Sequence, residues 1–85
     1  MRKLKYMTTS YCQPCKLYGP VLKRLAADYS DVLEIEKIDI EEHPEVGQKY
    51  GVTNVPTVIE VDSNDQEIHR VVGALPYDQA VEQLV

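Results

Sequence analysis

Two cysteines, Cys12 and Cys15, are the only thiols in this 85-residue chain, and Gln13 and Pro14 separate them. With this spacing the two sulfurs can face each other across one helical turn, so they can close a disulfide and open it again. A metal site would need about four ligands, whereas the two histidines of the chain lie far from this pair. We therefore expect redox chemistry here, with no bound metal or cofactor beyond the Cys12–Cys15 disulfide itself.

The residues after Cys15 predict that this pair opens a helix. Apolar residues recur there at three- and four-residue spacings, as they do on one face of a helix. A cysteine at a helix N-terminus lies beside unpaired backbone N–H groups and the positive end of the helix dipole, both of which stabilise a thiolate. Cys12 is thus the predicted nucleophile. Cys15, one turn further on, is the predicted resolving thiol that releases reduced substrate.

The composition predicts one soluble globular domain over residues 1–85. Hydrophobic residues make up 44% of the chain and charged residues 27%, an ordinary globular balance. The net charge of −5 argues against nucleic acid as a partner. No apolar region follows the basic N-terminus, and none approaches the roughly 18 to 20 residues of a membrane span. We expect a cytoplasmic monomer without membrane contact, and in that compartment a CxxC pair is more often catalytic or metal-binding than structural.

Periodicity predicts the element order βαβαββα. The expected strands cover residues 3–8, 32–40, 58–61 and 67–72, and the expected helices cover 15–29, 44–51 and a last segment from 76 onward. The first helix should bury Leu17 with the other apolar residues of its face, and the polar residues between Thr8 and Tyr11 should cap its start. A right-handed crossover makes the first two strands parallel, and the last two form a hairpin. The result is an α/β fold with a four-stranded mixed sheet and helices on both faces.

Six short motifs occur in an order and at spacings that resemble the thioredoxin family. They are Tyr11–Lys16, Gly19-Pro20, Lys37–Asp39, Lys49–Val52, Val55–Thr57 and Val72–Leu75. The resemblance covers nearly the whole chain and implies a thioredoxin-like fold. It also implies a thiol–disulfide oxidoreductase that reduces protein disulfides through Cys12 and Cys15, and that a flavoprotein similar to thioredoxin reductase recharges.

The same resemblance implies a substrate site around the disulfide. Pro56 would follow a cis peptide bond and pack beside the disulfide, which leaves the backbone of Val55 to pair with an extended substrate. Val55, Thr57, Gly73 and Ala74 would contact substrate. Tyr11, Gln13 and Pro14 would support the cysteines, although partial burial or a first-turn proline explains Tyr11 and Pro14 as well.

Two departures from the family bear on function. Thioredoxins place a buried aspartate beneath the thiols, but Tyr6 stands at the matching position, so we expect proton transfer at Cys15 to use solvent or another group. The chain is also as short as a glutaredoxin, which leaves glutathione-dependent activity as an alternative. Against it, the Pro-Tyr centre of glutaredoxins is missing, and Val55 replaces their threonine. A thioredoxin-fold binding subunit with incidental thiols is the remaining alternative.

Overall fold

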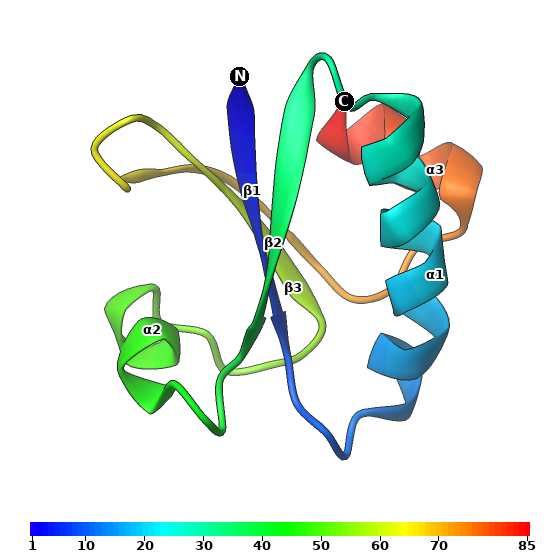
Figure 1. Cartoon of the computed structure of the whole chain (residues 1–85). Coiled ribbons are helices and arrows are strands. Elements are labelled where there is room, and N and C mark those ends of the chain that lie inside the picture. The colour runs from blue at the N-terminus through cyan, green and yellow to red at the C-terminus, as the bar shows by residue number, and fades with distance from the viewer.

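A four-stranded sheet carries three helices in the computed structural model, which describes residues 1–85 (Figure 1). The elements are β1 (Arg2–Thr8), α1 (Gln13–Asp28), β2 (Leu33–Asp39), α2 (Pro44–Lys49), β3 (Thr57–Val61), β4 (Glu67–Val72) and α3 (Tyr77–Leu84). This order confirms the predicted βαβαββα arrangement, with strand ends shifted by at most one residue and helix ends by at most two.

The strands lie in the order β2-β1-β3-β4, with β1 parallel to β2 and antiparallel to β3. The pairing places Tyr6 beside Lys37 and Thr8 beside Asp39, while Tyr6 faces Val58 on its other side. Helices α1 and α3 lie on one face of the sheet and α2 on the other (Figure 1). Because β1 feeds directly into α1, the start of α1 lies at the edge of the sheet where β1 and β2 both end.

Alternating side chains of β1 supply both hydrophobic cores, as expected when successive residues of a strand point to opposite faces. Leu4 and Tyr6 are buried against α1 and α3, whereas Met7 is buried on the α2 side. Buried residues of the α1 side are Leu4, Tyr6, Tyr18, Leu22, Leu25, Leu33, Val58, Ala80 and Leu84. Those of the α2 side are Met7, Ile38, Tyr50, Ile59 and Val61. The central strand therefore holds the start of α1 at a defined place over the sheet.

Leu17 of α1 faces solvent, although the apolar pattern of the helix predicts that it is buried. Leu17 is 77% exposed, so the prediction that it belongs to the buried face is wrong. The buried residues of the helix are Cys15, Tyr18, Leu22 and Leu25, spaced three, four and three apart. Leu17 lies about 100° around the helix from Tyr18 and faces solvent. The helix also continues through Pro20 without ending.

Candidate active site

Cys12 is the N-cap of α1, and its sulfur takes part in the cap. The Cys12 backbone is extended, with φ −92° and ψ 108°, and Sγ accepts a hydrogen bond of 3.1 Å from the backbone N–H of Cys15. The two cysteines form a disulfide with their Cα atoms 5.1 Å apart. Cys12 is 8% exposed and Cys15 4%, so both sulfurs lie just below the surface, with Cys15 the deeper residue.

This cap differs from the one predicted from the sequence. The polar residues between Thr8 and Tyr11 were expected to satisfy the first N–H groups of the helix, but the structure assigns that part to the sulfur of Cys12. The sulfur occupies the place that a serine or aspartate oxygen takes in an ordinary N-cap. When the disulfide opens, a negative charge on this sulfur faces the positive end of the helix dipole.

The loop before β3 lies against the disulfide. The Val55–Pro56 peptide bond is cis, and the carbonyl oxygen of Val55 lies 3.7 Å from Cys12 Sγ. The carbonyl of buried Pro56 accepts a 2.8 Å hydrogen bond from the N–H of Gly73, which follows β4. Gly73 has a φ of +96°, a conformation that only glycine adopts without strain. The loop before β3 thus contacts Cys12 through Val55 and Gly73 through Pro56, which links three segments far apart in the sequence.

The remaining predicted site residues divide into exposed and buried ones. Tyr11 is 85% exposed, and Gln13, Pro14 and Ala74 are also exposed. Thr57 is only 1% exposed, and its hydroxyl donates to the carbonyl of Asn54 at 2.6 Å. Because β3 turns the Thr57 side chain into the protein, the contact with substrate, which stays a prediction, would have to use the Thr57 backbone.

Two tyrosines lie beneath the disulfide. The hydroxyl of Tyr6 donates a 2.9 Å hydrogen bond to the backbone carbonyl of Cys15, and the Tyr6 ring meets the Tyr18 ring edge to face at 6.0 Å. The Tyr18 hydroxyl is buried without a hydrogen-bond partner. Burial, with a smaller contribution from nearby Tyr6, raises the pKa of Tyr18 to about 12. Tyr18 therefore stays uncharged in this core.

A hollow of about 260 Å³ reaches Cys15 from the side of the sheet edge, and sequence reasoning missed it. Lys16, Lys37 and Asp39 line it together with Cys15. Lys37 and Asp39 come from the last residues of β2, which the parallel pairing sets beside Tyr6 and Thr8. The motif Lys37–Asp39 was visible in the sequence, but its closeness to Cys15 depends on that register.

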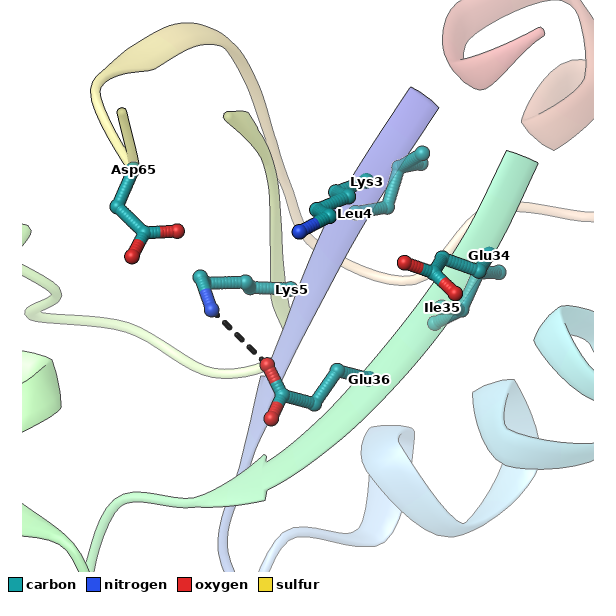
Figure 2. A pocket seen from close by; sticks show the side chains of 7 residues that line it. All are labelled: Lys3, Leu4, Lys5, Glu34, Ile35, Glu36 and Asp65. Carbon is teal, nitrogen blue, oxygen red and sulfur yellow. Dashed lines mark hydrogen bonds and ion pairs between the residues drawn. The ribbon is translucent and has the colours of Figure 1, made fainter. Parts of the chain in front are cut away.

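The other face of the sheet, beside its hydrophobic core, carries a polar hollow whose lining includes neither cysteine. This hollow has a volume of about 360 Å³, and Lys5 pairs there with Glu36 at 2.9 Å. Figure 2 shows Lys3, Glu34 and Asp65 around this pair. Its charges are of both signs. No group of three or more His, Cys, Asp or Glu side chains lies together in the structure. None of the three helices combines the length and apolar character of a membrane span.

Comparisons with known proteins agree on one family. A family model described as Thioredoxin matches residues 4–85. The thioredoxins of Staphylococcus aureus strains Mu50 and MW2 are each 41% identical to this chain over 75 residues, which is 88% of the chain and 71% of the relative. The crystal structure of oxidised mitochondrial thioredoxin 3 from Saccharomyces cerevisiae superposes with a TM-score of 0.83 at 27% identity. That match covers 96% of this chain and 76% of the yeast protein.

Proposed function

This chain belongs to the thioredoxin family and is a dithiol protein-disulfide oxidoreductase, and we propose that Cys12 is its nucleophile and Cys15 its resolving cysteine. One observation carries these roles: Cys12 Sγ sits at the N-cap of α1 and accepts the Cys15 N–H at 3.1 Å. That position stabilises a thiolate on Cys12. Cys15 is the more buried of the two and has no such cap.

The reaction proceeds through a mixed disulfide. The thiolate of Cys12 attacks one sulfur of a substrate disulfide, and the other substrate sulfur leaves as a thiolate and takes up a proton. Cys15 then loses its proton and attacks Cys12 Sγ. The bond between Cys12 and the substrate breaks, the Cys12–Cys15 disulfide forms, and two electrons have passed to the substrate.

The substrate segment lies, in this proposal, across the surface made by Tyr11, Val55, Gly73 and Ala74. The Val55 carbonyl lies 3.7 Å from Cys12 Sγ, so backbone pairing with Val55 would bring a substrate sulfur to the nucleophile. Gly73 has no side chain to block an approaching backbone, and a Cβ there would meet nothing within 4 Å in the free protein. Exposed Tyr11 adds apolar contact area beside the cysteines.

The proposal includes the source of electrons. A flavoprotein similar to thioredoxin reductase would reduce the Cys12–Cys15 disulfide in the cytoplasm, with this protein acting as a monomer and shuttling between reductase and substrates. What supports this is the membership of the family together with the Val55 carbonyl beside Cys12, where the backbone of a protein rather than a small thiol would dock.

Two single substitutions test the assigned roles. Cys12→Ser should reduce no protein disulfide, whereas Cys15→Ser should accumulate a covalent adduct with a disulfide-containing substrate such as insulin, because the second step is blocked. The adduct is detected by mass on a non-reducing gel and should disappear with dithiothreitol. Ser63→Ala, in the exposed turn between β3 and β4, is the control that retains activity. An adduct formed by Cys12→Ser rather than Cys15→Ser would reverse the assignment.

A further inference from the structure

The resolving step requires a group that takes the proton of Cys15, and the core beneath the disulfide offers only phenols. Tyr6 uses its hydroxyl as a donor to the Cys15 carbonyl. Tyr18 holds its proton more tightly than an ordinary tyrosine, because burial raises its pKa to about 12. With the Tyr6 hydroxyl engaged as a donor and Tyr18 keeping its proton, neither phenol is placed to take the proton of Cys15. The proton has to leave in another direction.

The hollow between the start of α1 and the edge of the sheet supplies that direction. It has a volume of about 260 Å³, and Cys15, Ser10, Lys16, Lys37 and Asp39 are among its lining residues. A space of this size holds several water molecules when its walls are polar. It therefore connects the buried Cys15 to polar side chains at the protein surface.

Asp39 is the carboxylate in this hollow, and the fold sets its orientation. Thr8 is buried on the α1 side of the sheet, and the parallel register places Asp39 beside it. Asp39 Oδ1 accepts hydrogen bonds from the N–H groups of Glu41 at 2.8 Å and Glu42 at 3.4 Å. No hydrogen bond within the chain engages Oδ2. The carboxylate is thus held by one oxygen and keeps the other for solvent.

We propose that Asp39 receives the proton of the Cys15 thiol through water in this hollow, an inference that rests on the proposed roles of the two cysteines. In the mixed disulfide, the Cys15 S–H proton passes by way of water to the Asp39 carboxylate. The Cys15 thiolate then attacks Cys12 Sγ, the bond from Cys12 to substrate sulfur breaks, and the departing substrate thiolate takes a proton from solvent. Electrons and protons balance with the substrate disulfide as the only oxidant.

The charged and titratable groups around this path come from three elements. Lys16 of α1 and Lys37 of β2 line the hollow, and Tyr6 of β1 lies at its inner end with Cys15. Both ammonium groups bring positive charge to the lining that Asp39 and Cys15 share.

A chromogenic disulfide separates the two steps. Reduced protein mixed with excess dithiobis(nitrobenzoate) in a stopped-flow instrument releases one coloured thiolate when Cys12 attacks and a second when Cys15 resolves the mixed disulfide. Asp39→Asn keeps an oxygen for the Glu41 N–H but removes the base. We expect it to slow the second release about tenfold to a hundredfold near neutral pH and to leave the first within twofold. The difference should narrow as pH rises, because hydroxide then takes the proton.

The matched control is Glu34→Gln, which removes an exposed carboxylate of the same strand on the opposite face (Figure 2). Glu34→Gln should change the rate of neither release. Asp39→Glu, which keeps a carboxylate, should retain part of the wild-type rate of the second release. If Asp39→Asn does not fold, Asp39→Ser is used in its place, because the serine hydroxyl can still accept a hydrogen bond in the turn. A second release that is equally fast in Asp39→Asn and wild type at every pH overturns the proposal. Loss of the first release in Cys15→Ser would instead overturn the cysteine roles.

Discussion

The hydroxyl of Tyr6 donates a 2.9 Å hydrogen bond to the backbone carbonyl of Cys15, which ties the central strand to the first turn of α1. This bond is buried, so removing its donor leaves a carbonyl with less compensation for lost hydration. We expect Tyr6→Phe to lower the free energy of unfolding of the oxidised protein by about 1 kcal/mol. Urea unfolding followed by circular dichroism measures the change. An unchanged midpoint would show that the hydroxyl contributes nothing to holding α1.

Tyr18→Phe is the matched substitution and should have the opposite sign. The Tyr18 hydroxyl is buried without a partner, so folding removes its hydration and returns no hydrogen bond. Removing it should raise the free energy of unfolding by about 1 kcal/mol. Because the two rings touch, the double variant should be measured as well to reveal coupling. A loss of stability in Tyr18→Phe would mean that the hydroxyl finds a partner in solution.

Tyr18 should also make the protein sensitive to alkaline pH. Its pKa is about 12 in the folded protein and 10.0 ordinarily, so the unfolded chain gives up this proton first. The free energy of unfolding is therefore unaffected by this group below pH 10 and falls by about 1.4 kcal/mol per pH unit as the pH rises from 10 toward 12. Unfolding free energies measured from neutral pH to pH 11 should therefore fall more steeply for wild type than for Tyr18→Phe. Parallel curves would contradict this account.

The order of elements followed from the sequence because its causes are local. Each signal depends on a few neighbouring residues: the alternation in β1, the three- and four-residue spacing after Cys15, and Pro44 and Gly51 at the two ends of the predicted second helix. The redox pair was predictable for the same reason. Its cap was not, because a sulfur that accepts the Cys15 N–H is less usual than an oxygen from the preceding polar residues.

The missed features depend on contacts between distant segments. Leu17 and Tyr18 are both apolar, and only the packing of Tyr18 on Tyr6 decides which of them faces the core. The side chain of Thr57 points inward because β3 pairs with β1 in one particular register. Asp39 lines the hollow at Cys15 because β2 pairs in a particular register with the other edge of β1. A one-residue slip of either strand would reverse these orientations.

Two glycines should respond to alanine in opposite ways. Gly19 lies within α1 in an ordinary helical conformation, and Gly51 after α2 has a φ of +61°, yet an added Cβ meets nothing within 4 Å at either place. Gly19→Ala should stabilise the protein by up to about 1 kcal/mol, because alanine loses less backbone entropy in a helix. Gly51→Ala should destabilise the protein by about 1 to 2 kcal/mol, because a residue with a Cβ is strained in the left-handed backbone conformation. Thermal unfolding compares the two, and equal signs would contradict the conformational explanation.

Acid should weaken the contact that joins β1, β3 and the end of α3. Arg2 forms two hydrogen bonds to the Glu60 carboxylate, at 2.8 and 3.0 Å, and a third of 2.7 Å to the Leu84 carbonyl. The hydrogen bonds from Arg2 lower the pKa of Glu60 below its ordinary value of 4.5. Because the pKa of Glu60 is lower in the folded protein, its ion pair with Arg2 adds to the free energy of unfolding above pH 4.5. This stabilisation is lost as the pH falls through the pKa of Glu60 in the folded protein.

Glu60→Gln tests this acid dependence. At neutral pH it should lower the free energy of unfolding by about 1 kcal/mol, because Glu60 is largely buried but Arg2 stays partly exposed. The difference from wild type should shrink as the pH falls below 4.5, since wild-type Glu60 then becomes neutral too. Glu34→Gln, which removes an exposed and unpaired carboxylate, should show almost no difference at any pH. A deficit in Glu60→Gln that persists in strong acid would assign the effect to packing instead of charge.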